Sequence, residues 1–257
     1  RIPTRHLRRS PMTGRGAGPQ PTPDTPSEAN TASGGSRWHR PPGIIAAYEA
    51  EPWSTRAHTM VRWASIPMET VQQELPSSGE ILEIGCGHGL FSLTAALGSE
   101  DRRIIGTDID GAKLVEARRA AQAAGLGQDR LEFVQVESDW RPPAEQTYGA
   151  VVIIDVLYLL GIAAALDLTA AAARVVQPGG TLLIKEMDTT RRAKSAWCST
   201  QELISTKLTR VTEGETVELV PLDAIRTVMQ EAGLDVTTRA LDRHYVHPHA
   251  LLIGQRC

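Results

Sequence analysis

The segment ILEIGCGHG, residues 81–89, is the best starting point for working out the architecture. Residues 80–84 have the apolar content of a buried strand, alternating glycines follow, and residues 90–97 read as a helix. Glycines at such a turn let the backbone approach a ligand closely, and the N-terminus of the next helix favours an anionic group. A nicotinamide fingerprint would place glycine or alanine where Leu90 stands, so the spacing argues against a dehydrogenase. The alternative that these glycines only form a tight turn stays open at this point.

The same alternation of strand and helix continues on the carboxyl side of this segment. Apolar runs predict strands at residues 103–107, 131–136, 150–154, 181–186, 216–220, 235–241 and 250–254, and helices at 112–124, 163–176 and 222–232. Alternation of this kind requires parallel strands with right-handed crossovers. The last two strands are separated only by residues 242–249, which is too short for a helical crossover. We therefore expect a Rossmann-like three-layer α/β fold with a mostly parallel, seven-stranded sheet and one antiparallel strand near the C-terminus.

Composition divides the chain into a tail and one folded domain. Residues 1–42 hold half of all the prolines and seven arginines, and they lack apolar periodicity. Such a segment cannot offset its ordering entropy, so a disordered, basic, Pro/Gly-rich tail is expected. Residues 43–257 are expected to form the domain, with a helical cap at 43–76 and the Rossmann-like core at 80–257.

Several classes of protein are disfavoured by the composition. Three cysteines, widely spaced and without a CxxC pair, support neither a disulfide framework nor a zinc site. The longest apolar run, residues 150–166, contains Asp155 and is shorter than the ~20 residues that a membrane-spanning helix needs. No apolar segment follows Arg8 and Arg9 to complete an export signal. We expect a cytoplasmic protein without integral membrane association, and the oligomeric state is left open.

A second motif, GTDID at residues 106–110, places acids at the end of the second predicted strand. A carboxylate about twenty residues beyond the glycine loop can accept hydrogen bonds from both hydroxyls of a ribose. Asp108 is preferred for this role because it ends the strand directly. Asp110 is instead placed to cap the following helix.

With these motifs in view, the chain resembles the class I S-adenosylmethionine-dependent methyltransferases over residues 80–254. ILEIGCGHG is similar to the first motif of that family, GTDID to its second-strand acid, and VVQPGGTLLI at 175–184 to the turn and strand after its fourth helix. The resemblance implies S-adenosylmethionine as cofactor. It implies that the cofactor is bound by Glu83, Gly85, Cys86, Gly87, Gly89, Asp108, Ile109, Glu137, Ser138 and Asp155.

The resemblance also distributes roles among some of these residues. Glu83 would lie beside the loop that holds the methionyl moiety, Asp108 would bind the ribose, and Ile109 would pack on the adenine. Glu137 stands where the family more often has Asp for the adenine amino group, and Asp139 competes with it. Gly149 also departs from the family, which often opens the fourth strand with an acid.

The catalytic residue is not identified by the sequence, and four candidates are retained. Asp155 and Tyr158 follow the fourth parallel strand, where ligands bind in open α/β sheets. Asp155 could instead cap a helix, or it could orient the ammonium of the cofactor or the substrate. Glu186, with Asp188, is expected to follow the fifth strand, and His88 occupies the variable position of the glycine loop, where packing or hydrogen bonding is favoured over catalysis. The histidines at 244, 247 and 249 are read as part of a turn rather than a metal site.

We expect methyl transfer to a small-molecule acceptor, with secondary or lipid metabolism preferred. Residues 154–157 lack the proline-aromatic motif of adenine and cytosine amino methyltransferases, which makes a nucleic-acid partner unlikely. The alternatives are an RNA or protein methyltransferase that uses the basic tail, and a non-catalytic S-adenosylmethionine-binding protein. Acceptor recognition is assigned to the cap and to residues 188–214, whose arginines could hold an anionic or lipid-like acceptor. For Trp53 and Trp63 a place in the core is favoured over ligand contact.

Overall fold

The computed structural model describes residues 42–188, 219–241 and 249–257. The expected tail, most of the segment 188–214, and the histidines at 244 and 247 lie outside these ranges. Helix α1 (Pro42–Ala47) begins at the last residue of the expected tail. Helices α2 (Trp53–Ser65) and α3 (Met68–Gln73) complete the cap, for which the sequence predicted one or two helices.

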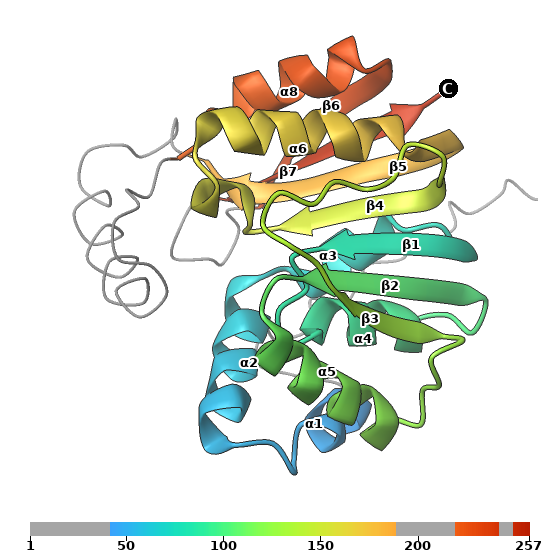
Figure 1. Cartoon of the computed structure of the whole chain (residues 1–257), viewed down its shortest axis with the longest axis vertical. Coiled ribbons are helices and arrows are strands. Elements are labelled where there is room, and N and C mark those ends of the chain that lie inside the picture. Colours follow the sequence, from blue (N-terminus) through green and yellow to red (C-terminus); the bar gives the residue numbers. More distant parts are fainter. Residues whose placement is uncertain (1–41, 189–218, 242–248) are drawn as a thin grey trace, which may run out of the picture. The chain divides into compact units, whose positions relative to one another are not determined.

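A seven-stranded sheet forms the centre of the described structure (Figure 1). Its strands are β1 (Gly79–Ile84), β2 (Arg102–Asp108), β3 (Leu131–Gln135), β4 (Tyr148–Ile154), β5 (Val176–Met187), β6 (Leu234–Ala240) and β7 (His249–Arg256). The order across the sheet is β3-β2-β1-β4-β5-β7-β6. Strand β7 pairs antiparallel with both β5 and β6, whereas β1 to β5 pair in parallel. This confirms the predicted fold, a mostly parallel sheet with one antiparallel strand near the C-terminus.

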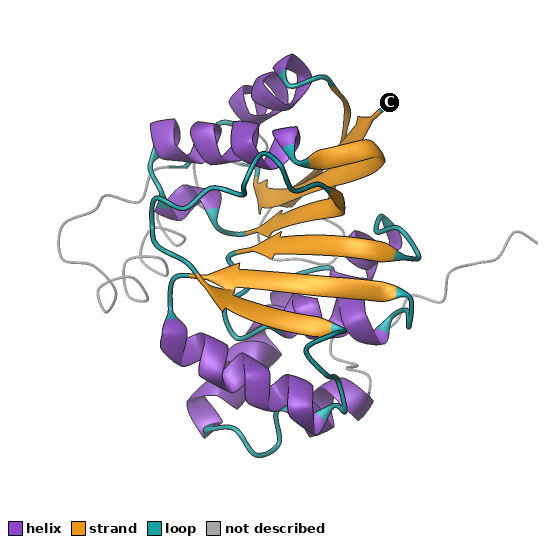
Figure 2. Ribbon diagram, turned by 45° about the vertical axis from the view of Figure 1, so that its right-hand side comes forward, coloured by secondary structure: helices purple, strands orange, loops and turns teal. Residues whose placement is uncertain are grey.

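Helices cover both faces of this sheet (Figure 2). They are α4 (Leu90–Leu97), α5 (Gly111–Ala123), α6 (Ile162–Arg174) and α8 (Leu222–Glu231), with a short 3₁₀ helix η1 (Leu157–Leu159) after β4. Alternate residues of the strands enter two separate cores. One core joins the sheet to the cap, α4 and α5, and the other joins it to α6 and α8. All seven residues of β4 are buried, which fits its apolar run and its position between two layers of helices.

The strand order reverses between β1 and β4, because the chain moves outward through β2 and β3 and then returns to the other side of β1. In open α/β sheets, ligands bind outside the carboxyl ends of the strands at such a reversal. The glycine loop follows β1 and Asp155 follows β4. The two segments that the sequence singled out therefore lie at one place in the fold.

Two strand predictions need correction. Strand β5 begins at Val176 rather than residue 181, because Tyr148 pairs with Val176 and Ala150 with Thr181, so the residues between them bulge out of the ladder. Residues 219 and 220 are not in a strand, and residues 216–218 lie outside the described ranges. The buried side chain of Val220 packs into the core with α8, which explains its apolar character without a strand.

Candidate active site at the carboxyl edge of the sheet

The glycine loop combines tight packing with one open position. Gly85, Gly87 and Gly89 all have positive φ, at 77°, 54° and 75°. A Cβ on Gly85 would lie 2.3 Å from Val156, and one on Gly89 would lie 2.5 Å from the ring of Phe133. A Cβ on Gly87 would meet nothing within 4 Å. The outer glycines therefore allow close packing, while the backbone at Gly87 faces space in which a ligand could be held.

Helix α4 begins directly after this loop without a side-chain cap. Gly89 is its N-cap residue and has no side chain to cap the helix, while the backbone N–H of Ser92 in the first turn interacts with the buried carboxylate of Glu83. The first N–H groups of a helix have no partner within the helix, and they carry the positive end of its dipole. This end of α4 can therefore receive an anionic group such as a carboxylate.

The two acids of the second motif have different partners. Asp108, the last residue of β2, accepts hydrogen bonds from the backbone N–H of Gly87 at 2.7 Å and of Asp110 at 2.9 Å. Asp110 accepts from the N–H groups of Ala112 and Lys113 and so caps α5. The predicted cap at Asp110 is confirmed. Asp108 contacts the glycine loop, and its role as a ribose ligand stays a prediction.

Glu83 is buried beneath the glycine loop. Its carboxylate accepts a short hydrogen bond from the hydroxyl of Ser92 in α4. Burial raises the pKa of Glu83 to about 7, although the Ser92 hydroxyl and the nearby Arg62 act in the opposite direction. Cys86 is also buried, and burial raises the pKa of its thiol, so the neutral form prevails. Both residues lie at the loop, as the resemblance implies.

Side chains that follow β2 and β3 extend the same edge. Ile109, which follows Asp108, is 58% exposed. Glu137 and Ser138 are exposed after β3, and so is the competing Asp139. The N–H of Val136 donates to the carbonyl of Asp108 at 3.0 Å, which holds this segment against the end of β2. The adenine-binding candidates thus share one edge, while the choice between Glu137 and Asp139 stays a prediction.

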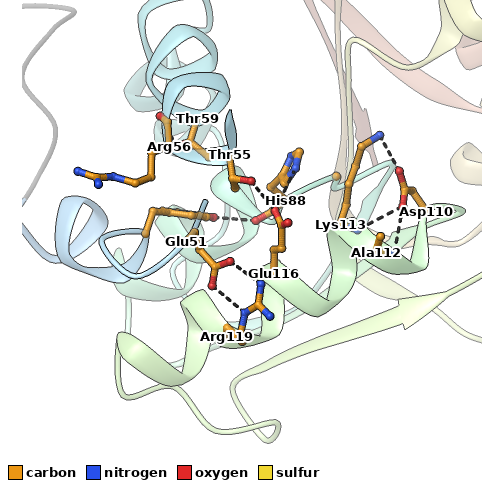
Figure 3. A network of polar contacts seen from close by, with 12 residues as sticks. Glu51, Thr55, Arg56, Thr59, His88, Asp110, Ala112, Lys113, Glu116 and Arg119 are labelled. Carbon is orange, nitrogen blue, oxygen red and sulfur yellow. Dashed lines mark hydrogen bonds and ion pairs between the residues drawn. The ribbon is translucent and has the colours of Figure 1, made fainter. Parts of the chain in front are cut away.

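A polar network connects the cap to the glycine loop and α5 (Figure 3). The hydroxyl of Tyr48 donates to the carbonyl of His88 at 2.8 Å. Thr55 donates to the carboxylate of Glu116 at 2.6 Å, and the Nε2 atom of His88 lies 3.4 Å from the same oxygen. The ring of His88 also packs 4.8 Å from that of His58. These contacts are the packing and hydrogen-bonding role that the sequence favoured for His88.

Beyond β4 lies a cluster of charged groups. Asp155 accepts hydrogen bonds from Lys185 in β5 at 2.5 Å and from Arg62 in α2 at 2.8 Å. Burial would raise the pKa of Asp155, but Lys185 and Arg62 outweigh this effect and hold the pKa below its usual value. Asp155 does not cap a helix, because the N-cap residue of η1 is Val156 and it has no side-chain hydrogen bond. Its helix-cap interpretation is therefore wrong.

Glu186 differs from expectation in position. It lies within β5, not after it, and both Glu186 and Asp188 are buried. The carboxylate of Glu186 accepts hydrogen bonds from the N–H groups of Val156 and Leu157, at 3.1 and 2.9 Å. Burial, followed by the charge of Asp155, raises the pKa of Glu186 to about 7. Glu186 therefore holds the turn that follows β4.

The remaining candidates lie close to this cluster or away from it. Tyr158 lies in η1, where burial and the charge of Asp155 raise the pKa of its hydroxyl to about 12. His249 is buried at the start of β7, where its charge lowers the pKa of Asp155. Within the described ranges, no group of three or more potential metal ligands is found. No helix of those ranges is both long and apolar enough to span a membrane.

Sequence reasoning did not pair Lys185 and Arg62 with Asp155. The signal for Lys185 was present, because it is a lysine in the middle of the apolar segment TLLIKEM, residues 181–187. A charged residue within a strand buried on both faces needs a partner. For the tryptophans, Trp63 is buried as expected, but Trp53 is 74% exposed, so its expected place in the core is wrong.

Comparison with known proteins identifies the domain. The model of a methyltransferase domain matches residues 81–180. A comparison with curated proteins gave no significant match. Among solved structures, an O-methyltransferase family protein from Burkholderia thailandensis is 26% identical, with a TM-score of 0.60 over 79% of this chain and 60% of that one. The S-adenosylmethionine-dependent methyltransferase SibL is 20% identical, with a TM-score of 0.63 over 79% of this chain and 57% of that one.

The fold also occurs in a protein named for another reaction. The [4+2]-cyclase SpnF is 14% identical, with a TM-score of 0.59 over 76% of this chain and 82% of that one. Because this chain spans only 60% and 57% of the first two structures, their activities do not transfer to it as a whole. The matched segment, the sheet order and the glycine loop agree with one another. Residues 81–180 thus match a methyltransferase domain, and the fold and its solved neighbours are consistent with the class I S-adenosylmethionine-dependent methyltransferases.

Proposed function

We propose that this protein transfers a methyl group from S-adenosylmethionine to a small-molecule acceptor and releases S-adenosylhomocysteine. The observation that carries the proposal is the open backbone at Gly87, which lies between Asp108 and the N-terminus of α4, whose N-cap residue is a glycine. The donor molecule needs an acceptor for its ribose hydroxyls and a site for its carboxylate. The residues at this edge offer both.

The donor would be held by groups at the ends of β1, β2 and β3. Asp108 would accept hydrogen bonds from the ribose, the first turn of α4 would receive the carboxylate, and Ile109 would cover one face of the adenine. Glu137 and Ser138 would meet the adenine edge. Glu83, whose pKa is about 7, would become ionised beside a positively charged ligand.

The chain's part in the reaction is mainly alignment. S-adenosylmethionine supplies a strongly electrophilic methyl group, so transfer depends on an in-line nucleophile more than on a strong base. Asp155 already binds Arg62 and Lys185, so it is poorly placed to take a proton or to hold the cofactor's ammonium. The hydroxyl of Tyr158, with a pKa of about 12, stays protonated and can donate a hydrogen bond. The O-methyltransferase name of the Burkholderia protein favours an oxygen acceptor.

Calorimetry tests the proposal through donor-site binding. The full chain should bind S-adenosylhomocysteine and should not bind NAD. In Asp108→Ala we expect affinity for S-adenosylhomocysteine to fall by ~10- to 100-fold, because a hydrogen bond to a charged group contributes about 1.5–3 kcal/mol. The matched control is Asp110→Ala, which removes the cap of α5 and the ion pair with Lys113 and leaves Asp108 in place. A folded wild-type protein that fails to bind S-adenosylhomocysteine would refute the proposal.

A further inference from the structure

The three side chains of the charged cluster, Arg62, Asp155 and Lys185, differ in their exposure to solvent. The side chain of Lys185 is 1% exposed, that of Asp155 12%, and that of Arg62 31%. Arg62 comes from the cap, whereas Asp155 directly follows β4 and Lys185 lies in the neighbouring strand β5. Of these three residues, Arg62 therefore offers the charged group that is most open to solvent.

Stability alone does not explain this cluster. Replacing a buried ion pair with apolar side chains of similar size is often neutral or stabilising, because both charges must leave water. Asp155 also has a φ of 55°, and it is the one non-glycine residue of the described ranges with a positive φ. Strained backbone of this kind gathers at functional sites, where the surrounding structure holds it in place.

The hydrogen-bonding state of the cluster indicates the charge of its ligand. The carboxylate of Asp155 already receives one cation on each oxygen, so a further cation gains little there. The two nearby glutamates have their own donors, Glu83 from Ser92 and Glu186 from backbone N–H groups. The guanidinium of Arg62 uses only its NH1 atom toward Asp155 among the contacts of the described residues. Its remaining donors can bind an acceptor.

The position of Arg62 relates these donors to the proposed reaction. Arg62 lies close enough to Glu83 to lower the pKa of that carboxyl, and close enough to Tyr158 to lower the pKa of its hydroxyl. Its hydrogen bond to Asp155, which follows β4, places it near the carboxyl edge of the sheet, beside the proposed donor site. Planar guanidinium groups bind carboxylates through two parallel hydrogen bonds, a geometry that lysine cannot supply.

We propose that the methyl acceptor carries a carboxylate, and that Arg62 binds this group while Asp155 and Lys185 hold the guanidinium in position. This inference rests on the proposed function, since it assigns the acceptor side of the same site. Among the arginines of the cap, it selects Arg62 over the exposed Arg56, whose side chain has no part in the cluster. Arg62 would be an acceptor-binding residue, and Asp155 and Lys185 would be positioning residues.

The test compares two probes of nearly the same shape, benzoate and benzamide, each titrated into the full chain by ligand-detected NMR. Benzoate should bind saturably, and benzamide at least tenfold more weakly. Arg62→Gln should weaken benzoate at least tenfold and leave benzamide unchanged. Arg62→Lys keeps the charge but loses the planar fork, so its affinity for benzoate should lie between those of the wild type and Arg62→Gln. Arg56→Gln, from the same helix, is the matched control and should bind benzoate as the wild type does.

Three results would overturn the inference: no saturable binding of benzoate, equal binding of the two probes, or unchanged binding of benzoate in Arg62→Gln. Circular dichroism of each variant checks that the chain is folded. Titrating the same samples with S-adenosylhomocysteine separates this inference from the proposed function. Arg62-dependent binding of benzoate without any binding of S-adenosylhomocysteine would refute methyl transfer and retain the anion site, whereas the reverse would refute only the carboxylate acceptor.

Discussion

Asp155→Asn should destabilise the protein strongly, because it leaves the ammonium of Lys185 without its buried partner. Lys185 is 1% exposed and lies 2.5 Å from Asp155. Removing one member of a buried ion pair costs about 3–5 kcal/mol. Asparagine tolerates the left-handed backbone that Asp155 adopts, so the change removes charge without adding backbone strain. For a domain of this size the melting temperature should fall on the order of 10 °C.

The assay is equilibrium unfolding in urea, and the control is Asp167→Asn. Asp167 pairs with Arg141 at 2.8 Å, but its side chain is 62% exposed. Surface pairs of this kind contribute ~0–1 kcal/mol, so the control should remain close to the wild type. Asp155→Asn combined with Lys185→Met should recover most of the lost stability, because no buried charge then lacks a partner. A loss below about 1 kcal/mol in Asp155→Asn, equal to that of the control, would refute the reasoning.

The pH dependence of this variant provides a second check. Burial lowers the pKa of Lys185, and Asp155 opposes that effect in the wild type. Without Asp155 the pKa falls further, so the unfolded chain binds a proton that the folded chain does not. The free energy of unfolding should then rise with pH, by up to ~1.4 kcal/mol per pH unit, between the folded pKa and the unfolded value of about 10.4. If the free energy of unfolding of the variant did not change between pH 7 and 9, the pKa of Lys185 in the folded variant would not be lowered as this reasoning requires.

Three further changes test the loop, the buried acid and the cap. Gly89→Ala should lower the free energy of unfolding in urea by about 2–4 kcal/mol, because the added Cβ would overlap an aromatic ring. Gly87→Ala should lower it by about 1–2 kcal/mol, because only the positive φ opposes the change. Equal losses in the two variants would contradict this packing. Glu83, whose pKa is raised to about 7, favours folding below pH ~4.5 and loses this contribution as pH rises through 7. The free energy of unfolding of Glu83→Gln should therefore increase, relative to that of the wild type, by about 3 kcal/mol as pH rises from 5 to 8. Parallel pH profiles of the two proteins would exclude a buried titrating acid at this position. In thermal unfolding, Trp63→Ala should lose about 3–5 kcal/mol of stability and Trp53→Ala less than ~0.5 kcal/mol. The larger loss would occur in Trp53→Ala if Trp53 were the core residue.

Local features of this protein could be predicted from the sequence because each depends on a short run of residues. The hydrophobic periodicity and the apolar content of about ten residues predicted the strand before the glycine loop and the helix after it. The bounds of α4 agree with this prediction. The position of Asp108 at the end of a strand and the capping role of Asp110 followed from their order in the sequence. The antiparallel pairing of β6 and β7 followed from the short connection between them.

Contacts between distant segments were decided only by the tertiary structure. Arg62 and Asp155 are 93 positions apart and Asp155 and Lys185 are 30 apart, so no local pattern relates them. Which charges meet depends on where α2 lies relative to the ends of β4 and β5. The same holds for the tryptophans: Trp63 is buried and Trp53 exposed on one helix, because burial depends on which face of α2 meets the core. Hydrophobic periodicity specifies that a helix has such a face, whereas packing between elements decides what that face contacts.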